Sequence, residues 1–197
     1  MTVISLIRQH QQGLYVDQGA KPPIHAPEML LIGCVDARLP IQDIGIPYGK
    51  ALIYRNIAAL VAGMEAGVRL GEAAALEFAV NVMRVRDIVV MGHTECGGIR
   101  ACLDGSQGEE KQHIRKYLSP LRDVRERVIL DGGDFVAQAR AMEKAAVCQS
   151  VENLRSYEAV SAAEAAGRLT LHGWVIDIAT HAIAEMDRAG DFWPMSK

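Results

Sequence analysis

Short runs of consecutive apolar residues constrain the fold of this chain more than any other feature. They cover residues 29–34, 51–54 and 88–91. Apolar runs that do not alternate with polar residues are typical of strands buried on both faces of a parallel sheet. Between the second and third runs, apolar residues recur at helical spacing over residues 69–83. Strands that alternate with helices predict an α/β fold with a mainly parallel sheet flanked by helices.

The rest of the chain predicts further helices around this sheet. A weak helical pattern covers residues 3–16, and the prolines of residues 19–27 indicate a linker. Three further helices are expected, over residues 97–103, from an N-cap at Ser119 through Val128, and over residues 136–154. A late strand is expected within residues 169–178. We therefore expect an N-terminal helical arm and linker, residues 1–24, followed by a single α/β domain, residues 25–197.

Composition narrows the class of protein. Half of the 197 residues are hydrophobic and the formal net charge is -3, so a sizeable core is expected, and a nucleic-acid partner is not. The apolar start is short and precedes Arg8, unlike a secretory signal, and no window approaches the length of a membrane span. These features predict a soluble, cytoplasmic protein without a membrane partner. Its four cysteines are then expected to be ligands, nucleophiles or core residues rather than disulfides.

Two polar segments each follow one of the apolar runs. The first run ends at Cys34 and is followed by Asp36 and Arg38. The third run is followed by His93 and Cys96. The carboxyl ends of parallel strands lie along one edge of the sheet, and ligands bind in the crevice there. Cys34, His93 and Cys96 are therefore expected to converge, although many residues separate them.

Two thiolates and one imidazole form a donor set that suits Zn²⁺. Three protein ligands leave a fourth tetrahedral position for water or substrate, which is typical of a catalytic rather than a structural zinc site. Cys102 is a fourth candidate by composition, but it lies nearly two turns along the predicted helix and is expected to face away. The spacing alone leaves a second interpretation open, in which these cysteines are small core residues.

Asp36 and Arg38 add a candidate catalytic pair. They are two residues apart, so an extended chain would point both side chains to the same side. Pairing with the guanidinium keeps a carboxylate ionised, and an ionised Asp36 beside zinc can orient a zinc-bound hydroxide toward an electrophile. The alternative is a simple surface ion pair, which contributes little to stability.

Taken together, these motifs resemble a known family. Cys-x-Asp-x-Arg followed by His-x-x-Cys-Gly-Gly resembles the signature of the β-class carbonic anhydrases. Residues 54–58, 73–80, 151–154 and 171–174 are similar to further landmarks of that family, so the resemblance spans roughly residues 25–178. It implies an α/β fold and a homodimer, often doubled to a homotetramer, in which N-terminal helices embrace the neighbouring subunit.

The same resemblance implies a site and an activity. Cys34, His93 and Cys96 would hold one zinc ion per subunit, and Asp36 with Arg38 would form the catalytic dyad. The implied reaction is the reversible hydration of carbon dioxide to bicarbonate and a proton by a zinc-bound hydroxide. A carbonyl sulfide or carbon disulfide hydrolase on the same scaffold is the nearest alternative, and a non-catalytic zinc-binding module is a second. The absence of a Cys-x-x-Cys motif disfavours a thiol redox enzyme.

Three positions depart from the family pattern. The common Ser between the dyad residues is Ala37 here, which removes one hydrogen-bonding group. His25 stands where many members carry a Gln that lines the substrate pocket. Leu31 stands where bicarbonate-inhibited members carry Trp, so no inhibitory bicarbonate pocket is expected.

Four residues are candidates for substrate binding. His25 is a candidate for polarising substrate or transferring a proton, with an ordinary loop histidine as the alternative. Tyr54 is a candidate whose alternative is core packing. Gly97 and Gly98 are expected to allow close approach of the backbone to substrate or to a neighbouring subunit, or to open a helix.

Overall fold

Six strands form one mixed sheet in the order β2-β1-β3-β4-β5-β6. The computed structural model describes residues 2–12, 24–67, 69–105 and 111–195. The strands, in chain order, are β1 (Met29–Cys34), β2 (Ala51–Asn56), β3 (Asp87–His93), β4 (Thr170–Ile176), β5 (Ile183–Met186) and β6 (Phe192–Pro194). The first four pair in parallel and the last two join antiparallel at one edge. The predicted α/β fold with a mainly parallel sheet is confirmed.

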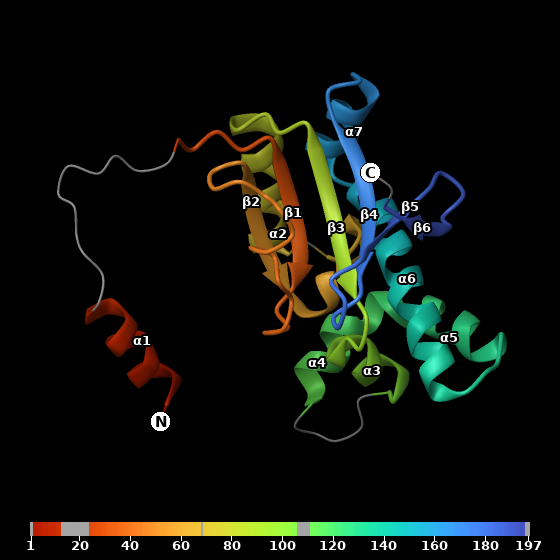
Figure 1. Cartoon of the computed structure of the whole chain (residues 1–197). Helices are drawn as coiled ribbons and strands as arrows, with labels where there is room; N and C mark the ends of the chain where they lie inside the picture. Colours follow the sequence, from red (N-terminus) through yellow and green to blue (C-terminus); the bar gives the residue numbers. More distant parts are fainter. Residues whose placement is uncertain (1, 13–23, 68, 106–110, 196–197) are drawn as a thin grey trace.

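Helices cover the sheet and extend beyond its carboxyl end (Figure 1). The helices are α1 (Val3–Gln12), α2 (Leu70–Glu77), α3 (Gly97–Leu103), α4 (Gln112–Leu118), α5 (Arg122–Leu130), α6 (Phe135–Leu154) and α7 (Glu158–Ala165). Short 3-10 turns occur at η1 (Ile57–Ala59), η2 (Met64–Ala66) and η5 (Ser119–Leu121), and η3 (Phe78–Val82) is a π-helical continuation of α2. None of the helices in the described ranges is long and apolar enough to cross a membrane.

The core consists of two clusters on opposite faces of the sheet. Successive residues of a strand point to opposite faces, and Leu31 and Met91 accordingly pack in one cluster while Ile32 and Val90 pack in the other. The first cluster is covered mainly by α3, α5 and the first half of α6, and the second by α2, α7 and the second half of α6. Burial on both faces explains why these strands are continuously apolar.

Two glycines let α6 lie unusually close to the sheet. Val147 of α6 is buried, and its methyl groups face Gly92 on β3 and Gly173 on β4. A methyl group added at Gly92 would lie 2.7 Å from Val147 Cγ2, and one added at Gly173 would lie 3.0 Å from Val147 Cγ1. Gly92 directly precedes His93, so this close packing supports the strand end that carries the imidazole.

Several sequence predictions differ from the structure in detail. Ser119 does not cap a helix, because its hydroxyl donates to the carbonyl of Lys116 in α4, and it belongs to η5 between two helices. The cap residue observed on α6 is Asp134, whose carboxylate accepts from the amide of Ala137. Helices α4 and α7 and the strands β5 and β6 were not predicted.

The predicted N-terminal arm corresponds to α1. This helix stands apart from the rest of the described chain in Figure 1, and four of its apolar side chains are exposed: Val3, Ile4, Leu6 and Ile7. Residues 13–16 of the predicted helix, and 19–23 of the predicted linker, lie outside the described residues. The domain boundary at residues 24 and 25 stays a prediction.

Candidate metal centre

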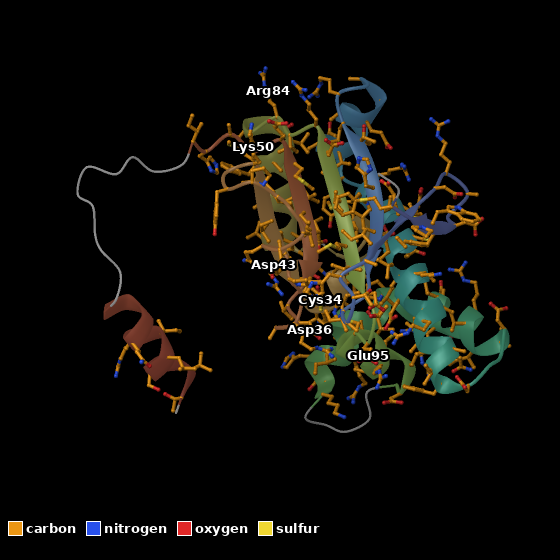
Figure 2. The ribbon with its side chains drawn as sticks, viewed as in Figure 1. Cys34, Asp36, Asp43, Lys50, Arg84 and Glu95 are labelled. Carbon is orange, nitrogen blue, oxygen red and sulfur yellow. The ribbon has the colours of Figure 1, made fainter. Side chains whose placement is uncertain are left out.

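Three buried side chains meet at the carboxyl end of the parallel strands. Cys34 is the last residue of β1, His93 is the last residue of β3, and Cys96 immediately precedes α3. The two sulfur atoms are 3.9 Å apart, and one donor atom from each of the three residues lies within 4.8 Å of the others. Figure 2 shows Cys34 with Asp36 and Glu95 at this end of the sheet, far from Lys50 and Arg84 at the other. The structure thus brings together the residues predicted to converge.

The imidazole of His93 presents a free lone pair to the cluster. Its Nδ1 lies 2.9 Å from the carbonyl oxygen of Thr94, which can only accept a hydrogen bond, so Nδ1 carries the proton. Nε2 is buried and has no hydrogen-bond partner among the described residues. A buried unpaired ring nitrogen is costly unless something binds it. Its position beside two thiols indicates that a metal ion is what it binds.

The two thiols influence each other strongly. The pKa of Cys34 is lowered, chiefly because its sulfur shares a hydrogen bond with Cys96. The pKa of Cys96 is raised, because the neighbouring Cys34 thiolate and burial both oppose a second negative charge. For His93, burial acts to lower the pKa, but the adjacent Cys34 sulfur and its negative charge outweigh burial and raise the pKa. A cation between the sulfurs would remove the repulsion that keeps one of them protonated.

Asp36 and Arg38 form a two-pronged ion pair beside the cluster. Arg38 Nε and Nη2 donate to the two carboxylate oxygens of Asp36 at 2.9 and 2.8 Å. The pairing is made in a turn rather than in extended chain, since the amide of Arg38 also donates to Asp36 Oδ1 and the amide of Leu39 donates to the Asp36 carbonyl. Arg38 therefore holds the pKa of Asp36 well below its usual range. Asp36 Oδ2 lies 3.9 Å from His93 Nε2, so an ionised carboxylate faces the cluster.

Comparison with known proteins places this geometry in a family. The family model described as carbonic anhydrase matches residues 29–183, most of the chain. The chain belongs to the β-carbonic anhydrase family. It is 35% identical over 152 residues to beta carbonic anhydrase 5, chloroplastic, of Arabidopsis thaliana, an alignment that covers 75% of this chain and 50% of that protein. The chain thus spans about half the length of this plant relative.

Two further relatives extend the likeness over more of the chain. Carbonic anhydrase 1 of Escherichia coli O157:H7 is 34% identical over 172 residues, covering 83% of this chain and 75% of that protein. A structure of tetrameric β-carbonic anhydrases from Sordaria macrospora superposes with a TM-score of 0.75 at 28% identity, covering 88% of this chain and 84% of that one.

The donor set of this β-carbonic anhydrase family member fits zinc, the metal that the family uses. Two sulfurs that each lie about 2.3 Å from a tetrahedral zinc ion are roughly 3.8 Å apart, and the observed separation is 3.9 Å. The hydrogen bond from His93 Nδ1 to a backbone carbonyl is the usual way in which a zinc-binding imidazole is oriented. Cys102 is buried in α3 and does not belong to the cluster, as predicted.

The predicted substrate-binding residues lie in different places. His25 is exposed near the amino end of β1, where its neighbour Ala26 donates to the carbonyl of Gly49, so within one chain it lies at the opposite end of the sheet from the cluster. Tyr54 packs against the core cluster on the face that α2 covers, and burial first, then the charge of Glu72, raises its pKa. Their roles toward substrate stay predictions.

The two glycines after Cys96 differ in their surroundings. A methyl group added at Gly98 would lie 2.8 Å from Ile57 Cγ2 and 3.1 Å from Ala58 Cβ, so Gly98 allows α3 to approach η1. A methyl group added at Gly97 would meet nothing among the described residues within 4 Å. Gly98 thus permits close packing within the chain, and Gly97 begins α3 beside open space.

Two supports of the site, the half-buried Arg55 and the buried Glu143, were not predicted from the residues. Arg55 of β2 donates to the carbonyls of Cys34 and Asp36 at 2.8 and 2.6 Å, which holds the loop that carries both. Glu143 of α6 accepts a hydrogen bond from the amide of Cys96 at 3.2 Å. The family segment at residues 54–58 includes Arg55, but no sequence signal distinguishes Glu143 from the other acidic residues of a long helix.

Proposed function

We propose that this chain catalyses the reversible hydration of carbon dioxide to bicarbonate and a proton. The observation that carries the proposal is the convergence of Cys34, His93 and Cys96, with donor atoms all within 4.8 Å, beside the ionised carboxylate of Asp36. Three protein donors suit a zinc ion that keeps one position for a reacting molecule. A zinc site of purely structural purpose would have no need for a carboxylate held ionised at its edge.

Zinc, when bound here, supplies a Lewis acid, which lowers the pKa of water to about 7 in the three-histidine carbonic anhydrases. The residues of this chain provide the remaining functions. Cys34 and Cys96 provide two neighbouring sulfur ligands for the metal. Arg38 donates hydrogen bonds to both carboxylate oxygens of Asp36 and so keeps that carboxylate ionised. Asp36 then accepts a hydrogen bond from the reacting water, which orients a lone pair of the water oxygen toward the carbon of carbon dioxide.

We further propose that the chain assembles as a homodimer or homotetramer. The exposed apolar side chains of α1 support this, because they would be covered by a neighbouring subunit. The related proteins from Sordaria macrospora are described as tetrameric. A cytoplasmic location stays a prediction, since the relatives include a chloroplastic enzyme as well as a bacterial one.

Stopped-flow hydration of carbon dioxide by zinc-loaded protein tests the proposal directly. We expect activity that depends on one zinc per chain and that is lost on chelation. Release of hydrogen sulfide from carbonyl sulfide and carbon disulfide is measured on the same preparation. Sulfide release with negligible hydration of carbon dioxide would show that the chain is a hydrolase of sulfur substrates instead.

A further inference from the structure

One peptide bond in the loop that carries His93 and Cys96 is held at both of its polar ends. It is the bond from Glu95 to Cys96. Its carbonyl oxygen accepts a hydrogen bond from Arg38 Nη2 at 3.2 Å, and its amide donates to Glu143 Oε1 at 3.2 Å. Both partners are charged, and such hydrogen bonds are about twice as strong as neutral ones. The peptide plane is therefore restrained from the dyad on one side and from α6 on the other.

The backbone at this peptide needs such restraint. Glu95 has a φ of 60°, in the left-handed region that residues other than glycine seldom adopt. The conformation turns the chain sharply enough for His93 and Cys96 to point at one another across a single turn. A left-handed non-glycine residue costs about 1–2 kcal/mol and persists where its surroundings enforce it.

Glu143 is placed to enforce it. The carboxylate is only 2% exposed, and burying a charge is unfavourable unless it is paired. Arg140 Nη1 pairs with both oxygens of Glu143 at 2.9 and 2.8 Å, and Arg140 Nη2 lies 3.5 Å from Glu95 Oε1. Glu95 in turn lies 3.7 Å from Arg38, so alternating charges connect α6 to the dyad.

An ion pair that only stabilises a helix does not need a buried carboxylate bound to the backbone of another segment, as a second pair nearby shows. Glu152, in the last turn of α6, and Arg155, just after the helix, form an ion pair at the same three-residue spacing, with the Glu152 carboxylate 69% exposed. That pair contacts no residue of the metal cluster. What distinguishes Glu143 is its burial and the third hydrogen bond, which comes from the amide of a cluster residue.

We propose that Glu143, neutralised by Arg140, is a positioning residue for the Cys96 sulfur. By holding the Cys96 amide it keeps the Glu95–Cys96 peptide in its left-handed turn and so aims the sulfur at the point shared with Cys34 and His93. The proposal rests on the zinc-dependent function above. Residues that orient a metal ligand in this way typically change metal affinity by about 10–100-fold when they are replaced.

The test compares two replacements of nearly equal size. Glu143→Gln keeps an oxygen acceptor for the Cys96 amide, whereas Glu143→Met removes it. Zinc affinity is measured by competition with a chromophoric chelator, and the cobalt-substituted proteins are compared by their thiolate-to-cobalt and d–d absorption bands. Glu152→Met, at the exposed pair of the same helix, is the matched control.

We expect Glu143→Met to bind zinc about 10–100-fold more weakly, with a shifted cobalt spectrum, and Glu143→Gln to recover much of the loss. Glu152→Met should match the parent. Parental zinc affinity and an unchanged cobalt spectrum in Glu143→Met would overturn the inference. Circular dichroism shows whether Glu143→Met folds. If it does not, Glu143→Gln decides. A zinc affinity of Glu143→Gln as low as that of a variant without a zinc ligand would overturn the inference, because the acceptor oxygen is retained in that variant. A parent protein that binds no zinc would instead refute the proposed function.

Discussion

Replacing Gly92 by alanine should push α6 away from the strand end that carries His93. The added methyl group would lie 2.7 Å from Val147 Cγ2, about 1 Å closer than carbon atoms favour. Forcing an extra methyl into a packed core costs about 1–3 kcal/mol, and the lower entropy of the unfolded chain with alanine returns about 0.4–1 kcal/mol. We therefore expect Gly92→Ala to lower the free energy of unfolding by about 1–2 kcal/mol.

The Val147→Ala variant isolates the contact. Alone it removes two buried methyl groups, which costs about 2–3 kcal/mol with the cavity that is left. In the double variant the alanine methyl at residue 92 occupies part of that space, so the two changes should cost about 1–2 kcal/mol less than their sum. Gly97→Ala is the control, because a methyl group there meets nothing within 4 Å among the described residues.

Urea unfolding of the metal-free proteins, followed by far-ultraviolet circular dichroism, gives the four free energies of the cycle. The slope with urea should be the same for all of them, which shows that the unfolding reaction is unchanged. Additivity of Gly92→Ala and Val147→Ala within about 0.5 kcal/mol would refute the argument, since independent sites behave in that way.

Four further predictions concern the site and the core around it. Asp36→Asn should retain one zinc per chain, measured by atomic absorption, while losing carbon dioxide hydration; undiminished hydration would contradict the role of Asp36. Cys34→Ser should lose zinc, whereas Cys102→Ser should keep it, and equal zinc contents would contradict the ligand assignment. Burial raises the pKa of Glu72, so its ionisation destabilises the fold as pH rises above the unfolded value of about 4.3. Glu72→Gln should therefore gain stability relative to the parent as the pH rises from the unfolded value through the raised pKa of Glu72, measured by urea unfolding, and a difference that stays constant with pH would contradict this. Tyr157→Phe removes a 2.7 Å hydrogen bond to Glu72 and should cost about 1–3 kcal/mol in the same assay at neutral pH, with no loss as the opposing result.

The parts of the fold that local patterns specify were predictable. The strands β1 and β3 are buried on both faces, so their apolar runs stand out, and the residues that follow them are brought together by the geometry of any parallel sheet. The antiparallel strands β5 and β6 were missed, since they are short and only partly buried. Helix α7 was missed because it is only eight residues long and has no side-chain cap hydrogen bond at its start.

The supports of the site could not be predicted in the same way. Glu143 lies in α6 among mixed polar and apolar residues, and nothing in that pattern marks one acidic residue as buried. Its neighbour Arg140 lies three residues away in the same helix, but the Cys96 amide that it binds comes from a distant part of the chain. Likewise the dyad was expected in extended chain, but hydrogen bonds to Asp36 close a turn there.

The amino-acid sequence by itself determined which donors are available, because Cys34, His93 and Cys96 follow apolar strands of a parallel sheet and are chemically suited to zinc, which predicts that the three meet. Only the tertiary structure decided how those donors are held. The burial of the donors and the restraint on the left-handed peptide at Glu95 arise from contacts between residues far apart in the chain, which no local pattern records.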